Sequence, residues 1–553
     1  MVQLQSRFGE FSRGSTELRY EGSKKNKMNC LPVILVAALT VAESQCAILY
    51  GQNEGPVTLP NDLLIGAGVA ALQVEGAWNE DGKAESNMDH LFHLGRLSPM
   101  GATDPHAHDV AADSYHRYKE DIKMAAALKL QVYRFSLSWP RILPNVTASK
   151  PNPKGVQFYH DVIDEVLRYN MTPMVTVYHF DHPQVLEDQF KGWWSPNMIP
   201  IFKEYARFVF NEYGGKVRYW TTVNEPNIQC TYFAQAGLIS GLYTEDEVSN
   251  HFQCQRNLLL GHAEAYHVFK EDKHEGMVGL TILNLPATPN STNPEDVYAA
   301  EAVNSLYAGT IYHPVVFGDY SQLSKDLAGE DLVPFTDTEK QLLQGSSDYI
   351  GVNVYNGGKA GWRKPTADEA EAAALLLGKT MKYLPNVALD IPNPQGPQSV
   401  QFFEGIHPEY LHNAVVWAWN TYKKPLIITE NGWGDVSGHG MKDELRAAYY
   451  SASLRTLVST MNSCGAKVIS FCAWSLIDAF EFTGGMSRQF GIVYVDYANK
   501  TLNRSFKESS QFWVDLAATR SVPFIKPESS TASSISSNLL TWAFVTLLTV
   551  ARR

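Results

Sequence analysis

Two glutamates, each placed where an apolar run of β-branched residues ends, are the first candidates for chemistry. Residues 216–226 read KVRYWTTVNEP, so Glu225 closes a short buried strand and Pro226 prevents that strand from continuing. Residues 424–432 read KPLIITENG and place Glu430 at the end of a second strand, before a glycine turn. Partial burial raises the pKa of a carboxyl group, which suits a general acid near neutral pH. Two such groups predict a hydrolase that uses a pair of carboxylates.

The stretches T-x-N-E-P and I-T-E-N-G together resemble the two signatures of glycoside hydrolase family 1, the β-glucosidase family, here in an animal, secreted form. The resemblance covers residues 63–513. It implies a retaining mechanism with Glu225 as acid/base and Glu430 as nucleophile, the two carboxyl groups being about 5–5.5 Å apart. It also implies that Arg134 lies beside the nucleophile and that Tyr355 forms a hydrogen bond with it.

The same resemblance implies a set of side chains that bind the terminal sugar. Sugar hydroxyls both donate and accept hydrogen bonds, so amide, imidazole and carboxylate groups at fixed positions can distinguish sugar stereochemistry. Taken alone, His179 and Trp474 would each be typical of an ordinary core residue. The residues that match the family set are Gln73, His179, Asn224, Asn353, Trp474, Glu481 and Phe482.

One stretch departs from the family pattern. Residues 473–482 read AWSLIDAFEF, with Ala479 and Phe482 where the family has Asn and Trp. Phe482 lacks the indole N–H that would bind a sugar hydroxyl, which leaves open the choice between gluco-, galacto- and fuco-configured sugars. Glu481 is retained, and because this carboxylate would repel a phosphate, we expect an unphosphorylated sugar.

The favoured function is that of a β-glucosidase, which removes terminal non-reducing β-D-glucosyl residues through a covalent glycosyl-enzyme. One alternative is a thioglucosidase resembling the myrosinases, which act on glucosinolates. Plant myrosinases replace the acid with Gln, a pattern that Glu225 excludes, but animal myrosinases keep both carboxylates. Another alternative is a non-catalytic binding protein resembling the klothos, which typically lose one catalytic glutamate, whereas this chain has both. The expected partner is a small glycoside or short oligosaccharide whose aglycone is not specified by these motifs.

Alternating strands and helices are expected around these positions. Eight strands that alternate with helices predict a single (β/α)₈ barrel, in which the carboxyl ends of all strands meet at one mouth. A doubly wound open sheet is the alternative, but no glycine-rich phosphate loop follows any strand. Insertions at 284–346 and 355–410 exceed ordinary loop lengths and are expected to build the substrate cleft. The expected strands cover residues 63–72, 132–139, 173–180, 216–225, 277–284, 347–354, 424–430 and 467–474.

Composition and cysteine content set further limits. In this chain of 553 residues the hydrophobic fraction of 44% suffices for a large core, and a net charge of −12 without a basic block argues against nucleic-acid binding.

In a secreted protein Cys230–Cys254 and Cys464–Cys472 could form disulfides, although other pairings or free thiols stay open. No C-x-x-C zinc pattern occurs, and the histidines of residues 106–109 (HAHD) are expected to be solvated. We therefore expect neither a metal nor a cofactor.

The amino-terminal residues indicate targeting. Residues 1–27 are polar and without periodicity and are expected to be a disordered extension, so that Met28 would be a more natural start. Lysines followed by a short apolar run at 31–42 predict a secretory signal peptide over residues 28–46. The barrel is then expected to span 50–522. Five sequons fit a secreted glycoprotein, at Asn145, Asn170, Asn290, Asn499 and Asn503.

Residues 523–553 combine a Ser-rich linker with a short apolar tail. Small residues, a polar spacer and an apolar tail are typical of a GPI-anchor signal, which would attach the secreted protein to the cell surface. The terminal Arg552 and Arg553 are untypical of such a signal, so an unstructured or amphipathic tail is an equal alternative.

Overall fold

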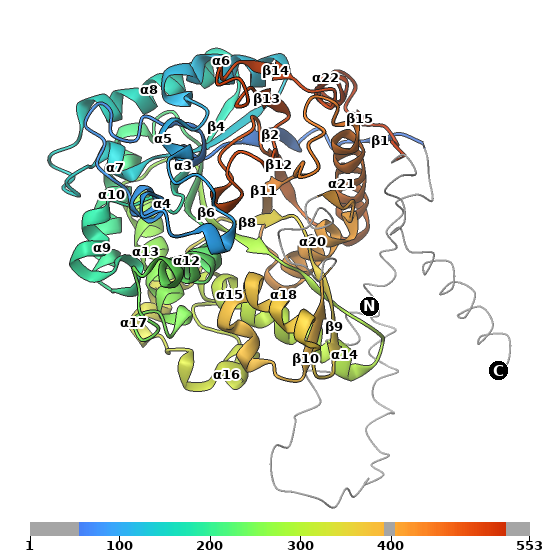
Figure 1. Cartoon of the computed structure of the whole chain (residues 1–553). Helices are drawn as coiled ribbons and strands as arrows, with labels where there is room; N and C mark the ends of the chain where they lie inside the picture. Colours follow the sequence, from blue (N-terminus) through green and yellow to red (C-terminus); the bar gives the residue numbers. More distant parts are fainter. Residues whose placement is uncertain (1–54, 392–403, 527–553) are drawn as a thin grey trace, which may run out of the picture.

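The computed structural model describes residues 55–391 and 404–526, and within them eight parallel strands close into a barrel (Figure 1). The predicted (β/α)₈ barrel is confirmed, and the open sheet is excluded. The predicted extension, the signal peptide and the apolar tail lie outside the described residues. In their order around the barrel the strands are β11 (Leu426–Asn431), β12 (Val468–Trp474), β2 (Leu64–Gly68), β3 (Val132–Ser136), β4 (Thr172–Tyr178), β5 (Tyr219–Asn224), β6 (Met277–Asn284) and β8 (Tyr349–Val354).

Helices surround this barrel and bury its outer face (Figure 1). The helix α8 (Pro153–Arg168), for example, buries one apolar side that includes Tyr159, Ile163 and Val166, as expected for an amphipathic helix against a sheet. A small separate cluster, including Val132, Met174 and Ile427, fills the barrel interior. The main covering helices are α6 (Ser114–Ala127), α8 (Pro153–Arg168), α10 (Met198–Tyr213), α13 (His251–Glu271), α20 (Pro408–Tyr422) and α21 (Glu444–Cys464).

The first strand is shorter than predicted. The expected strand 63–72 ends at Gly68, and a short helix, α3 (Ala71–Val74), follows. The N–H of Ala71 donates to Ser136 Oγ at 2.7 Å instead of continuing the strand ladder. A Cβ on Gly68 would lie 3.3 Å from the ring of Trp474, so a glycine here allows that ring to lie against the strand end.

The two insertions fold into a layer beside the barrel mouth, at the lower part of Figure 1. A three-stranded sheet joins them, with β9 between β10 and β7. Residues of both insertions, Tyr307 and Met381 among them, line the main cavity, as expected of segments that build a cleft. The elements are β7 (Ala287–Pro289), α14 (Pro294–Asn304), α15 (Thr310–Phe317), α16 (Gln322–Ala328), α17 (Asp337–Leu343), β9 (Gly358–Trp362), α18 (Ala367–Leu377) and β10 (Val387–Asp390).

One of the two disulfides considered from the sequence is present. Cys230, at the end of α11 (Pro226–Cys230), is bonded to Cys254 in α13. The Cys464–Cys472 pairing is wrong, because Cys464 ends α21 whereas Cys472 is fully buried inside the barrel. Between residues 55 and 526, leaving aside 392–403, we find no helix with the length and apolarity needed to cross a membrane.

Candidate active site

Glu225 follows β5 in an unusual backbone conformation. Its φ of 45° lies in the left-handed region, which residues with a Cβ seldom adopt, and Pro226 begins α11 immediately afterwards. The N–H of Glu225 donates to the carbonyl of Thr281 on the neighbouring strand at 2.8 Å. Such strained backbone persists only where the surrounding structure imposes it, and it is concentrated at functional sites. Here the strained residue is Glu225 itself, whose side chain lines the main cavity.

Glu430, the second-last residue of strand β11, lines the same cavity and accepts hydrogen bonds from two side chains. Arg134 Nη1 donates to Glu430 Oε1 at 2.7 Å, and Tyr355 Oη donates to Glu430 Oε2 at 2.7 Å. Burial alone would raise the pKa of Glu430, but the Arg134 charge and the Tyr355 hydrogen bond hold it below its ordinary value. The carboxyl group is therefore ionised near neutral pH.

Glu225 has the opposite electrostatic environment. Burial raises its pKa to about 8, and the negative charge of Glu430 adds to that rise. Asn353 Nδ2 donates to Glu225 Oε1 at 2.6 Å, and the amide oxygen of Asn353 accepts a hydrogen bond from Thr429 at 2.6 Å. Asn353 is fully buried and lies behind Glu225 rather than in the cavity lining, so it orients the carboxyl group.

The two carboxyl groups thus share one cavity and differ in protonation. A protonated acid and an ionised carboxylate are the two groups that retaining glycoside cleavage requires, one to protonate the leaving oxygen and one to attack the anomeric carbon. A non-catalytic barrel would have no need of a pair whose pKa values are moved in opposite directions.

The sugar-binding side chains expected from the sequence converge on the same cavity. Gln73 Nε2 donates to the carbonyl of Phe480 at 3.0 Å, while the buried Gln73 Oε1 is left without a protein partner and can accept from a ligand hydroxyl. Glu481 accepts a hydrogen bond from Trp474 Nε1 at 3.2 Å, and burial raises its pKa to about 8. The predicted residues that line the cavity are Gln73, His179, Asn224, Tyr355, Trp474, Glu481 and Phe482.

His179 and Asn224 surround the Arg134–Glu430 pair. Arg134 Nη2 donates to Asn224 Oδ1 at 2.9 Å, so one guanidinium group orients both the nucleophile candidate and the amide predicted to bind the sugar. His179 Nε2 lies 3.7 Å from Glu430 Oε1, longer than a hydrogen bond, and neither ring nitrogen has a partner among the described residues. Burial lowers the pKa of His179, so the imidazole is neutral and can exchange hydrogen bonds with a sugar hydroxyl.

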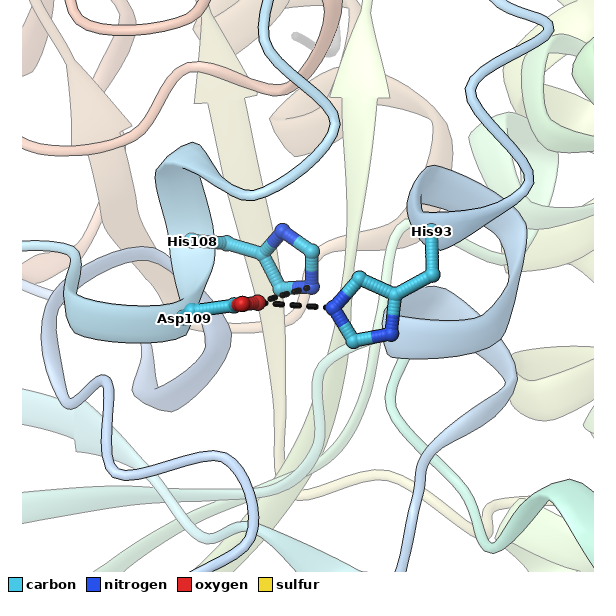
Figure 2. A group of neighbouring side chains, drawn as sticks. All are labelled: His93, His108 and Asp109. Atoms are coloured by element: carbon cyan, nitrogen blue, oxygen red, sulfur yellow. Dashed lines mark hydrogen bonds and ion pairs between the residues drawn. The ribbon is translucent and has the colours of Figure 1, made fainter.

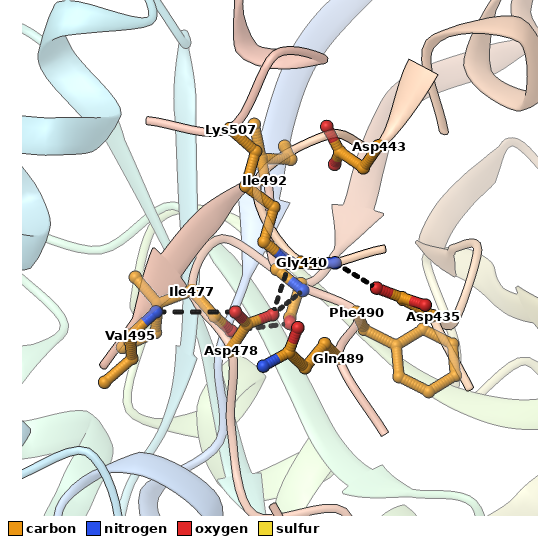
Figure 3. A network of polar contacts seen from close by, with 12 residues as sticks. Asp435, Gly440, Asp443, Ile477, Asp478, Gln489, Phe490, Ile492, Val495 and Lys507 are labelled. Carbon is orange, nitrogen blue, oxygen red and sulfur yellow. Dashed lines mark hydrogen bonds and ion pairs between the residues drawn. The ribbon is translucent and has the colours of Figure 1, made fainter. Parts of the chain in front are cut away.

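The segment that joins Trp474 to Glu481 is anchored by a buried ion pair, which Figure 3 shows. Lys507 Nζ donates to Asp478 Oδ1 at 2.7 Å, and Gly491 N donates to the same oxygen at 2.9 Å. Both charged side chains are almost completely buried, so removal of either partner would leave an uncompensated charge. The pair therefore fixes the loop on which Glu481 lies.

The outer part of the cavity contains residues that the sequence did not indicate. The cavity has a volume of about 890 Å³ and extends beyond the predicted sugar-binding residues over an apolar wall. These residues come from several separate segments, among them the short helices that follow β5, and have no shared motif. They include Met100, Ile228, Phe233, Leu238, Ile239, Val248, Leu285 and Met381, with Arg488 close to Glu481.

The expectation for the histidines of residues 106–109 is wrong in part. The side chain of His106 is 64% exposed, as expected of a solvated loop residue. His108, however, is only 2% exposed and packs against Phe92 and Phe480. The reason is that Phe92 of α4 (Asn87–His93) packs on His108, a contact that the sequence spacing does not reveal.

We expect a bell-shaped pH dependence of kcat/KM. Glu430 must be ionised, so activity falls on the acid side only as the pH drops through its lowered pKa. Glu225 must be protonated, so activity falls on the alkaline side as the pH rises through about 8. Initial rates on an aryl β-glucoside across this interval would measure both limbs. A rate that stays constant well above this alkaline value would contradict the assignment of the acid.

Comparisons with known proteins agree with this geometry. The model of the family described as "Glycosyl hydrolase family 1" matches residues 56–522. Myrosinase 1 of Brevicoryne brassicae is 33% identical over 479 residues, 83% of this chain and 98% of that protein. A cyanidin 3-O-glucoside 7-O-glucosyltransferase (acyl-glucose) of Delphinium grandiflorum is 34% identical over 492 residues, 86% of this chain and 92% of that protein.

A solved structure shows the same fold with a sugar bound. A rice β-glucosidase in a covalent complex with Glc superposes with a TM-score of 0.73 at 28% identity, covering 85% of this chain and 99% of that one. The family match extends over most of the chain and includes both carboxylate strands. The chain therefore belongs to glycosyl hydrolase family 1, and it is a retaining β-glycosidase.

Proposed function

We propose that this protein is a β-glucosidase that releases β-D-glucose from glucosides with an apolar aglycone. The observation that carries the proposal is a single cavity containing two carboxyl groups whose pKa values are moved apart, that of Glu225 upward and that of Glu430 downward. A buried acid and an ionised carboxylate in one site are the requirement for double displacement.

In the first step Glu430 attacks the anomeric carbon while Glu225 protonates the departing aglycone oxygen. The C–O bond to the aglycone breaks and an ester bond to Glu430 forms. The ester is neutral, so the negative charge of Glu430 is lost. Because that charge contributes to the raised pKa of Glu225, the Glu225 carboxylate left after proton transfer is stabilised. It then removes a proton from water, and the resulting hydroxide attacks the anomeric carbon and frees Glu430.

The wall beyond the sugar-binding groups supports an apolar aglycone. Phe233, Leu238 and Ile239 lie there, and Phe482 packs against Phe180 and Phe233 at ring-centroid distances of 5.9 and 5.2 Å. An aromatic or aliphatic aglycone would bury its surface against these side chains, and each buried methylene contributes about 0.8 kcal/mol.

A thioglucosidase is the second candidate, because a myrosinase is among the similar proteins and Arg488 lies in the cavity wall, where a cation would suit the sulfate of a glucosinolate. The protonated Glu225 supplies the proton that the alkoxide leaving group of an oxygen glycoside needs. Because animal myrosinases also keep both carboxylates, the substrate has to be decided by experiment.

A substrate panel tests the proposal. We expect an aryl β-glucoside to be cleaved with β-glucose as the first product seen by NMR, a galactoside and a fucoside more slowly, and a glucosinolate without appreciable release of sulfate. Rapid sulfate release would replace the proposal with a thioglucosidase. Inactivity on every glycoside, combined with tight binding of a protein, would replace it with a binding function.

A further inference from the structure

His93, His108 and Asp109 form a compact cluster outside the sugar-binding cavity (Figure 2). His93 ends α4, and the other two residues lie in α5 (Ala107–Val110). Asp109 Oδ1 lies 2.7 Å from His93 Nε2 and 3.7 Å from His108 Nε2, and one ligand atom from each residue falls within 4.8 Å of the others. Two imidazoles and a carboxylate therefore face one point.

His108 is the unusual member of this cluster. It is 2% exposed, yet neither of its ring nitrogens has a hydrogen-bond partner among the described residues. Its Nε2 is 3.5 Å from Asp89 Oδ1, beyond hydrogen-bonding distance. A buried polar group without a partner is destabilising, and in native proteins it usually interacts with an ion or water that completes the site.

The chemistry of the cluster indicates a class of ion. The rings of His93 and His108 are tilted by 34° with their centroids 4.9 Å apart, and Nε2 of each ring faces Asp109 Oδ1. The cluster therefore offers two imidazole nitrogens and a carboxylate oxygen. This is the ligand set that zinc and neighbouring divalent transition metals prefer over magnesium or calcium.

We propose that His93, His108 and Asp109 bind one zinc-class divalent metal ion in a structural site. In a tetrahedral zinc site, ligand atoms are about 3.3 Å apart. The His108–Asp109 distance of 3.7 Å is close to this value, and the ion would replace the proton that His93 and Asp109 share in their hydrogen bond of 2.7 Å. His106 Nδ1, 3.0 Å from Asp109 Oδ2 on an exposed side chain, is available for the fourth position, which water would otherwise fill. The partial exposure of His93 and Asp109 provides a route for the ion.

The surroundings fit a metal site. Glu85 Oε1 lies 3.7 Å from His93 Nδ1, on the side of the ring where an outer carboxylate would retain the proton and direct Nε2 to the metal. The ion would join α4 to α5 beneath the loop of Glu481, because His108 packs on Phe480 with ring centroids 5.6 Å apart. This role is independent of the proposed glucosidase activity.

A second group of similar composition does not support a metal. Asp435, Glu404 and His439 also lie near one another. Asp435, however, accepts hydrogen bonds from the backbone of Gly438, His439 and Gly440, the last drawn in Figure 3, so its lone pairs are already used. Asp109 also forms hydrogen bonds, with His93 and His106, so the two groups are distinguished by His108, a buried ligand residue whose ring nitrogens have no hydrogen-bond partner among the described residues.

The test uses the full chain, produced without a histidine tag, stripped with a chelator and dialysed. We expect it to take up one zinc ion per chain, measured by elemental analysis, and its Tm to rise by several degrees with added ZnCl₂ but not with MgCl₂. Cobalt should give the visible absorption bands of a low-symmetry site. His108→Gln and Asp109→Asn should abolish the uptake, the bands and the Tm rise.

His160→Gln is the matched control, because His160 also pairs with a carboxylate, Glu212, at 2.7 Å but on another surface. It should keep full zinc uptake. If His108→Gln does not fold, as judged by circular dichroism, His93→Gln takes its place. The proposal is overturned if the unmodified protein takes up no stoichiometric zinc, or if the cluster variants bind zinc as well as His160→Gln does.

Discussion

Replacing Glu430 with alanine is expected to lower kcat on an aryl β-glucoside by at least about a thousandfold, a loss typical of removing a group that acts on the reacting atoms. The variant loses the attacking carboxylate, whereas Arg134 and Tyr355, which hold that carboxylate at 2.7 Å, remain. The space left beside a cationic guanidinium is suited to a small anion. Azide should therefore restore part of the activity.

The azide product identifies the face from which Glu430 acts. An anion that occupies the position of the nucleophile attacks the anomeric carbon opposite the leaving group, so the expected product is the α-glucosyl azide. In Glu430→Gln the amide side chain fills the position that azide would occupy, so azide should not restore activity to this variant. Glu165→Ala, which removes a carboxylate paired with Arg168 on α8 and outside the cavity lining, should retain normal activity. Unchanged turnover by Glu430→Ala would remove the basis for the proposed nucleophile.

The positions of the two carboxylates could be predicted because a strand and its end are recognisable from a few neighbouring residues. A buried parallel strand is a short apolar run, and a proline or glycine marks its end, so Glu225 and Glu430 could be placed at strand termini from a few residues each. The barrel then brings all strand ends to one mouth. The structure adds the electrostatics: which carboxyl group faces Arg134 and which does not.

The features that escaped prediction depend on contacts between distant segments. β12 is apolar on both faces, so its sequence does not show that Cys472 points into the barrel, out of reach of Cys464. The burial of His108 could not be predicted, because nothing in residues 106–109 indicates that Phe92 of α4 packs against it. The apolar wall of the cavity likewise depends on how separate segments, including the short helices after β5, come together at the barrel mouth, which no single stretch of sequence indicates.

Replacing Glu225 with alanine should cause a loss that depends on the leaving group. An alkyl or phenyl glucoside requires a proton on the departing oxygen, so kcat/KM should fall by about 10²–10⁴-fold. A dinitrophenyl glucoside leaves as a stable anion, so its first step should be nearly unaffected and the glycosyl-enzyme should accumulate. Azide should then yield the β-glucosyl azide, the anomer opposite to that from Glu430→Ala. An equal loss for both leaving groups would contradict the role of Glu225 as the acid.

The same variant resolves an ambiguity in the alkaline limb. Burial raises the pKa of both Glu225 and Glu481 to about 8, so the pH profile of the unmodified enzyme does not identify which group is titrated. In Glu225→Ala only Glu481 remains. If Glu225 is the acid, kcat/KM for the dinitrophenyl glucoside should stop falling above about pH 8, because this substrate needs no proton. Persistence of the alkaline limb would instead assign it to Glu481, whose ionisation would place a second negative charge near Glu430 and weaken sugar binding.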